Sequence, residues 1–166
     1  KHKVLTYPRT DSKALPEDYL PVVKDTMSML ADEDLPGPLR VLLVEDDDAI
    51  RGLAARVLRR AGYQVTEAND GDSAAERLRL AALSKAPFAV IISDIVMPTG
   101  GGVRVLAARR QYAADTPLLW VTGHPGAIDM NGHSQTPSDD PMLQKPWTAA
   151  ELLFRVRSAI GHAAAV

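Results

Sequence analysis

The 166-residue sequence contains no cysteine, which excludes disulfide bonds, thiolate metal sites and cysteine nucleophiles. It contains no apolar run of the roughly 18 residues that a membrane span needs, and its N-terminus lacks the pattern of a signal peptide. It also lacks an excess of charge, because the formal net charge is only -2. These absences predict a cytoplasmic protein with no membrane partner and no electrostatic reason to bind nucleic acid.

The apolar content of 46% is sufficient for one buried core, and the length is that of about one domain. Residues 1–38 differ from the rest of the chain, because prolines interrupt them early and an acidic, Pro- and Gly-containing linker closes them at residues 32–38. We therefore expect an N-terminal extension over residues 1–38, one main domain over 39–161, and a short tail over 162–166.

From residue 39 onward, short β-branched runs alternate with segments of helical periodicity, which predicts βαβ units and a parallel sheet. The expected strands are Leu39–Val44, Tyr63–Ala68, Pro87–Ser93, Thr116–Val121 and Met142–Gln144. The expected helices are Ala49–Ala61 (capped by Asp48), a second from Asp70 or Asp72 to about Ser84, Gly102–Tyr112 with Val103 facing inward, and Ala149–Ile160 (capped by Thr148). We expect the doubly wound, flavodoxin-like strand order 2-1-3-4-5.

The stretch from Val90 to Pro98 organises the chain. It predicts a buried strand, with Asp94 following at the point where that strand should end and then a turn rich in Gly and Pro. In the expected strand order, Glu45 and Asp46 follow the neighbouring first strand and lie beside Asp94 at the carboxyl edge of the sheet. Three carboxylates so close together repel one another unless protons or a cation intervene. An all-oxygen donor set favours a hard ion, which predicts a Mg²⁺ site.

A hydroxyl and an amine follow the fourth and fifth strands, at Thr122 and Lys145. The same edge then combines an acidic metal pocket, a nucleophilic carboxylate, a hydroxyl donor and a cation. This set suits phosphoryl transfer to Asp94, because the metal and Lys145 can neutralise the phosphoryl oxygens while Thr122 donates a hydrogen bond.

Five motifs, in order and at suitable spacings, make residues 39 to 160 resemble a response-regulator receiver domain. They are Glu45-Asp46, Asp94, Met97-Pro98 with Gly102, Thr122-Gly123 and Lys145-Pro146. The resemblance implies a two-component or phosphorelay function, in which a histidine kinase or a histidine phosphotransfer protein phosphorylates Asp94. It implies that Asp46, Asp94 and the Val96 carbonyl bind Mg²⁺ with help from Glu45, that Lys145 pairs with the acyl phosphate, and that Thr122 moves toward it.

Such a domain is no conventional enzyme, because it catalyses only its own phosphorylation and dephosphorylation and relays the change to an output partner. One position departs from the family pattern. Many receivers carry a Tyr or Phe three residues before the lysine, and this chain has Met142 there. That departure, the weak helical pattern of residues 124–140 and the Thr122-Gly123 pair are more similar to the receivers of hybrid histidine kinases.

These residues have other interpretations. Asp94 could only cap a turn, and Glu45 to Asp48 could only cap a helix. Arg51 and three further arginines of the first helix are interpreted as a solvated face, and Trp147 is expected to pack at the start of the last helix. A phosphatase of the haloacid-dehalogenase type would need a second Asp two residues after Asp94, where this chain has Val96. An interaction-only pseudo-receiver would not need the acidic residues and the lysine.

The N-terminal segment carries a separate resemblance. Residues 5–12 and 15–18 are similar to the active-site tyrosine segment of type IA DNA topoisomerases, in which the tyrosine attacks a DNA phosphate. By motif position, Tyr7 would be the nucleophile and Arg9 its electrostatic support. The chain has no room for the metal-binding domain and the strand-holding toroid of that family. An inert remnant or fusion is therefore expected, with a topoisomerase fragment fused to a receiver as the alternative.

Overall fold

The structure is a computed structural model that describes residues 37–98, 101–123, 138 and 140–163. The chain divides into two units, residues 1–37 and residues 38–166. The described strands and helices belong to the second unit. No helix in the described part of the chain is long and apolar enough to cross a membrane.

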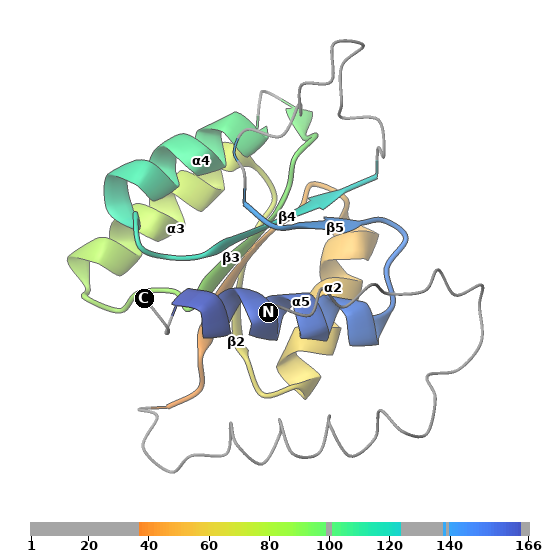
Figure 1. Ribbon diagram of the computed structural model, residues 1–166. Helices are drawn as coiled ribbons and strands as arrows, with labels where there is room; N and C mark the ends of the chain where they lie inside the picture. Colours follow the sequence, from red (N-terminus) through yellow and green to blue (C-terminus); the bar gives the residue numbers. More distant parts are fainter. Residues whose placement is uncertain (1–36, 99–100, 124–137, 139, 164–166) are drawn as a thin grey trace, which may run out of the picture. The chain divides into compact units, whose positions relative to one another are not determined.

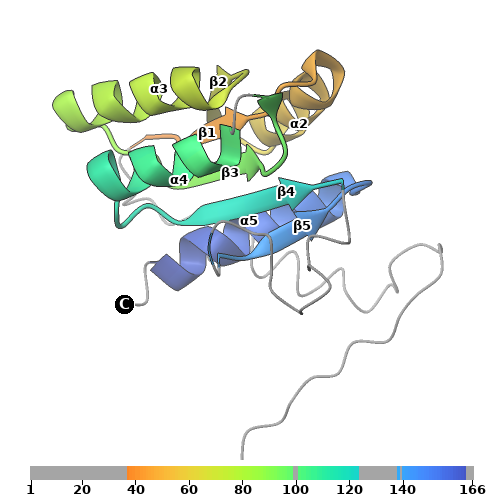
Figure 2. The same ribbon diagram turned by 90° about the horizontal axis from the view of Figure 1, so that it is seen from above.

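Five parallel strands form one sheet in the order β2-β1-β3-β4-β5, as the sequence predicts (Figures 1 and 2). The strands are β1 (Arg40–Val44), β2 (Gln64–Ala68), β3 (Val90–Asp94), β4 (Leu118–Thr122) and β5 (Met142–Gln144). The three central strands, β1, β3 and β4, are almost entirely buried, because helices cover both faces of the sheet. Their carboxyl ends therefore emerge from the core side by side.

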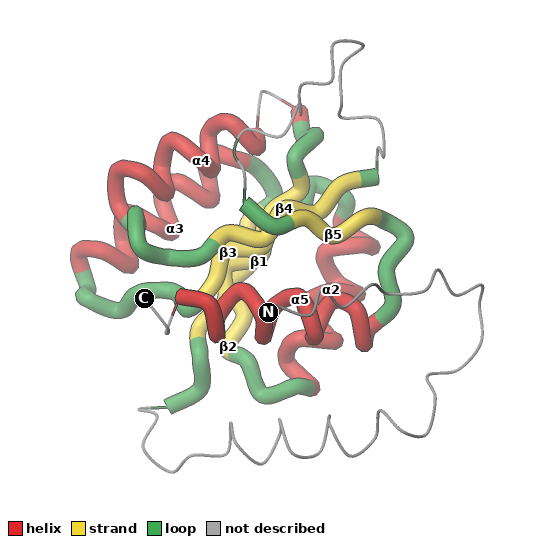
Figure 3. Tube along the Cα trace, in the orientation of Figure 1, coloured by secondary structure: helices red, strands yellow, loops and turns green. Residues whose placement is uncertain are grey.

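Two pairs of helices cover the two faces of the sheet (Figures 1 and 3). The helices α2 (Asp48–Arg60) and α5 (Ala149–Ala163) pack on one face, against strand residues such as Leu43 and Ile92. The helices α3 (Gly71–Leu83) and α4 (Gly101–Tyr112) pack on the other. Side chains alternate between faces along a strand, so each strand supplies apolar residues to both cores.

The helix ends follow local capping chemistry. Asp47 caps α2, whereas the sequence predicts Asp48: Asp47 has an extended backbone and accepts hydrogen bonds from the amides of Ala49 and Ile50. Asp70 caps α3 in a reciprocal arrangement with Ser73. These caps fix where each helix leaves the carboxyl edge of the sheet.

A partly buried polar network joins β4 to the segment that enters β5. The fully buried indole of Trp120 donates from Nε1 to Ser138 Oγ at 3.0 Å, and Ser138 Oγ lies 2.5 Å from Asp140 Oδ2. Arg109, near the end of α4, contacts the same Asp140 oxygen at 3.0 Å and donates from Nε to the carbonyl of Thr116 at 2.7 Å. The network ties β4 and α4 to the chain just before β5.

Candidate functional site

Three carboxylates meet at the carboxyl edge of β1 and β3. Glu45 directly follows β1, Asp46 is next, and Asp94 ends β3, which pairs with β1 in parallel register. One carboxylate oxygen from each residue lies within 4.8 Å of the others. Glu45 and Asp94 are buried, whereas Asp46 is exposed and open to solvent. The set contains only hard oxygen donors and therefore fits a cation such as Mg²⁺.

Lys145 connects two of these carboxylates. Its Nζ atom lies 2.6 Å from Asp94 Oδ2 and 2.7 Å from Glu45 Oε2. The lysine directly follows β5, and its backbone amide donates to the carbonyl of Thr122 at 2.7 Å, which continues the pairing of β4 and β5. The extended pairing places the ammonium group at the same edge as the acids.

Burial and ion pairing shift the pKa values of Glu45 and Lys145. Burial raises the pKa of Glu45, and the negative charge of Asp94 acts in the same direction, while the hydrogen bond to Lys145 opposes both. Burial alone would lower the pKa of Lys145, but its hydrogen bonds to Asp94 and Glu45 outweigh that effect and raise the pKa. The ammonium group is therefore charged at neutral pH and offsets the repulsion between the acids.

Both oxygens of Asp94 have partners. Oδ2 accepts from Lys145, and Oδ1 accepts from the backbone amide of Val96 at 3.0 Å. The turn after Asp94 is braced by the first turn of α4, where a Cβ added to Gly102 would lie 2.6 Å from the carbonyl oxygen of Ile95. Only a glycine allows this approach, so the helix fixes the backbone next to Asp94.

Thr122 is the last residue of β4 and is buried. In the register of the sheet, the preceding residue, Val121, pairs with Asp94, so Thr122 lies at the edge where the acids gather. The structure therefore brings Glu45, Asp46 and Asp94 together and places Thr122 and Lys145 at the same edge, as the sequence predicts. Their chemical roles, including that of the Val96 carbonyl, remain predictions.

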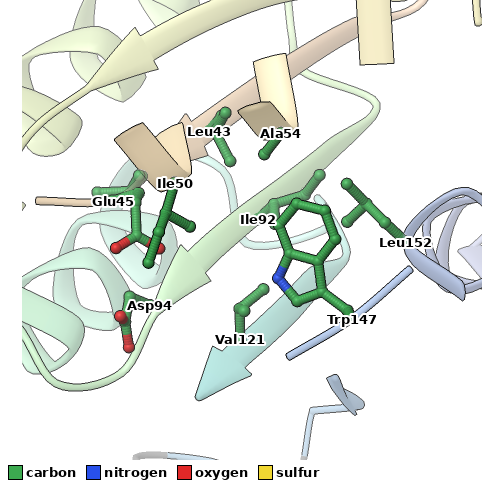
Figure 4. Close-up of a pocket in the computed structure, with 10 residues that line it drawn as sticks. Leu43, Glu45, Ile50, Ala54, Ile92, Asp94, Val121, Trp147 and Leu152 are labelled. Carbon is green, nitrogen blue, oxygen red and sulfur yellow. The ribbon is translucent and has the colours of Figure 1, made fainter. Parts of the chain in front are cut away.

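A small apolar pocket borders the carboxylates (Figure 4). Trp147 lies beside Val121 and Leu152, on the side of the pocket away from the two acids. As expected, Trp147 packs just before the last helix, against the core under α2 and α5. The pocket therefore joins the two acids to the apolar core on the side of α2 and α5.

Arg51, near the site, differs from the sequence-based expectation. It belongs to the first turns of α2 and is expected in a solvated face, but its side chain is only 16% exposed. It turns back to donate from a guanidinium nitrogen to the backbone carbonyl of Glu45 at 2.9 Å. Helical periodicity cannot reveal such a contact, because it depends on the path of the loop before the helix.

The structure does not test the roles expected for two residues of the N-terminal motif. Tyr7 and Arg9 lie outside the described residues, so the topoisomerase resemblance remains a prediction. Met142, the departure from the family pattern, is described: it is 39% exposed and pairs in the register of the sheet with Trp120.

Comparisons with known proteins agree with this geometry. Residues 41–157 match the family model of the response regulator receiver domain. The response regulator receiver protein CpdR of Brucella abortus is 32% identical over 121 residues, which cover 73% of this chain and 96% of CpdR. The chain spans only 19–51% of several other curated relatives, among them transcription factors and transcriptional regulators.

Two solved receiver structures are similar in fold to this chain. The receiver domain of the hybrid histidine kinase CckA is 32% identical, with a TM-score of 0.59, and the match covers 73% of this chain and 98% of that one. The receiver of the sensor histidine kinase PA1611 from Pseudomonas aeruginosa is 24% identical, with a TM-score of 0.64 over 75% of this chain and 99% of that one. That structure holds a magnesium ion in its active-site cleft. The receiver-domain family model matches residues 41–157, and the acids and the lysine gather at one edge of the sheet. The chain therefore belongs to the receiver domains of two-component response regulators.

Proposed function

We propose that this receiver accepts a phosphoryl group on Asp94 from a phosphohistidine of a histidine kinase or a histidine phosphotransfer protein. The observation that carries the proposal is the position of Asp94. Its carboxylate lies among two further acids and is in direct contact with Lys145 at the carboxyl edge of the sheet. No other group of three or more acids or histidines that could share an ion was found in the described ranges.

In the proposed step, an oxygen of the Asp94 carboxylate attacks the phosphorus atom. A bond between that oxygen and phosphorus forms while the phosphorus–nitrogen bond of the donor breaks, and its electron pair returns to the imidazole nitrogen. The ammonium group of Lys145, now 2.6 Å from Asp94 Oδ2, would pair with a phosphoryl oxygen. Thr122 would donate a hydrogen bond to another. Hydrolysis of the aspartyl phosphate by water returns the carboxylate.

The three carboxylates would hold Mg²⁺, which supplies neutralising charge for the phosphoryl oxygens. Asp46 and Asp94 are the proposed direct ligands together with the Val96 carbonyl, and Glu45 assists. The all-oxygen donor set supports this assignment. The magnesium ion in the related PA1611 receiver supports it as well. We also propose that the main domain spans residues 39–161, that it binds no DNA and that the protein is cytoplasmic. Phosphorylation would act on an output partner through a conformational change.

The test uses phosphoramidate, a small donor whose phosphorus–nitrogen bond resembles that of phosphohistidine. With Mg²⁺ present, the intact protein should gain roughly 80 Da, the mass of one phosphoryl group. Asp94→Asn should gain nothing. Asp115→Asn is the matched control, because Asp115 is exposed and precedes β4 at the opposite end of the strand. A gain in Asp94→Asn equal to that of the parent would reject Asp94 as the acceptor.

A further inference from the structure

The loop between β1 and α2 carries Glu45 and Asp46, and one side chain reaches back to it from the helix. Arg51 donates from Nη1 to the carbonyl of Glu45 at 2.9 Å. Its other terminal nitrogen pairs with Asp48. Its Nε lies 3.5 Å from Glu67 Oε2 on β2. One guanidinium group therefore contacts the start of the loop at Glu45, the first residue of α2 at Asp48, and β2 at Glu67.

The carbonyl that Arg51 holds belongs to the peptide group that joins Glu45 to Asp46. Because a peptide group is planar, fixing its oxygen also fixes the direction in which the chain enters Asp46. On the other side of Glu45, its backbone amide donates to the carbonyl of Ala68 at 3.1 Å. Asp46 is exposed, so the path of its backbone decides where its carboxylate lies relative to Asp94.

We propose that Arg51 is a positioning residue for divalent-cation binding: it touches no ion but fixes the backbone between the first two acidic residues of the site. The inference rests on the proposed function, because it concerns the cation site assigned there. Side chains that orient metal ligands from a distance commonly change metal affinity about 10–100-fold when they are removed.

Whether removing Arg51 weakens or strengthens Mg²⁺ binding distinguishes a positioning role from a purely electrostatic one. Arg51 is a cation near an acidic site, so its charge alone opposes the binding of Mg²⁺. If charge were its only influence, replacing it with a neutral residue would strengthen binding. If it positions the loop, the same replacement weakens binding, because the free site must then order the loop as it takes up the ion.

The test compares Arg51→Met with Arg59→Met by calorimetric titration of the full chain with Mg²⁺. Arg59 is the matched control: it carries the same charge on the same helix and also pairs with Glu67, at 2.7 Å, but it reaches β2 rather than the loop. We expect Arg51→Met to weaken Mg²⁺ binding about 10-fold, and Arg59→Met to leave it within twofold of the parent. Arg51→Lys keeps the charge but loses the forked geometry, and should fall in between.

A second measurement does not depend on the metal. Amide hydrogen exchange of residues 46–48 in the Mg²⁺-free protein should quicken in Arg51→Met, while exchange in β3 stays as in the parent. Unchanged exchange in the loop, unchanged or tighter Mg²⁺ binding, or equal weakening in Arg59→Met would each overturn the inference. If the parent itself binds no Mg²⁺, the proposed function fails on its own account. The exchange measurement then still decides whether Arg51 holds the loop.

Discussion

Lys145 and Asp94 are 51 residues apart in the sequence, yet Nζ of the lysine lies 2.6 Å from Oδ2 of the aspartate. The same Nζ atom is 2.7 Å from Glu45 Oε2. One partly buried cation thus balances two buried anions, each from a different strand end.

Replacing Lys145 with Met removes the cation and leaves two largely buried carboxylates facing each other. We expect a loss of about 3 kcal/mol in the free energy of unfolding at pH 7 without Mg²⁺. Mg²⁺ should stabilise Lys145→Met more than it stabilises the parent, because the ion no longer competes with the ammonium group. Urea unfolding with and without Mg²⁺ measures both effects, and Lys85→Gln, at an exposed lysine, is the control. A smaller Mg²⁺ effect in Lys145→Met would contradict this account.

Gly102 and Gly52 both lie within helices but should respond oppositely to alanine. A Cβ on Gly102 would meet the backbone carbonyl of Ile95 at 2.6 Å, and that backbone cannot move without disturbing the turn after Asp94. A Cβ on Gly52 would meet nothing within 4 Å. We expect Gly102→Ala to destabilise the fold by about 1–3 kcal/mol, and Gly52→Ala to stabilise it by about 0.5–1 kcal/mol. Thermal unfolding compares the stabilities of the two variants. If Gly102→Ala were more stable than the parent, the backbone of the turn after Asp94 could shift to accommodate the added Cβ.

The hydrogen bond from Trp120 to Ser138 should matter because the indole is fully buried. Ser138→Ala removes the acceptor of the Nε1 proton, and we expect a loss of about 1–3 kcal/mol. Trp120→Phe has no such proton, so Ser138→Ala should cost less in that background. A double-mutant cycle measured by urea unfolding gives the coupling between the two residues. Additive losses would mean that the bond contributes nothing measurable.

The Asp70 cap of α3 should make the free energy of unfolding depend on pH. The backbone amide of Ser73 donates to the Asp70 carboxylate and holds the pKa of Asp70 below its usual value of 3.8. An acid whose pKa is lower in the folded state stabilises that state at pH values above its usual pKa. The stabilisation is lost as the pH falls through the folded-state pKa.

Asp70→Ala should therefore cost about 1 kcal/mol at pH 7, and its difference from the parent should shrink as the pH falls below 3.8. Urea unfolding between pH 3 and 7 measures the difference, with Asp115→Ala as a control at an exposed loop position. A difference that stays constant over this range would assign the effect to helix propensity rather than to the charged cap.

The fold could be predicted because strand and helix patterns alternate regularly from residue 39 onward, and right-handed crossovers leave few topologies. The boundaries were less predictable. The third strand is expected from Pro87 but begins at Val90, which is where its register with Val41 of β1 begins. Strand limits depend on the partner strand as much as on the local sequence.

Two local predictions are wrong for reasons that need three dimensions. Val103 is expected to face inward but is 65% exposed. Gly102, its neighbour, must face the Ile95 carbonyl, and one helical step turns Val103 toward solvent. Asp48 is expected to cap α2, but Asp47 does so. Three consecutive aspartates are equivalent in type, and only the backbone path selects one.

The gathering of the acids and the lysine was predictable because each follows its own strand, and parallel strands bring their carboxyl ends to one edge. The contact of Arg51 with the Glu45 carbonyl was not. It joins a side chain to a backbone atom six residues earlier, across a turn whose shape the composition does not specify.

The order of the strands also determines when this cluster can form during synthesis. Glu45 leaves the ribosome first and Lys145 last, and β5 joins the sheet only by pairing with β4. A nascent chain that has not yet docked β5 has its acids but no ammonium group beside them. Under the proposed function, competence to take up a phosphoryl group would therefore require that translation has passed residue 145 and that β5 has paired with β4.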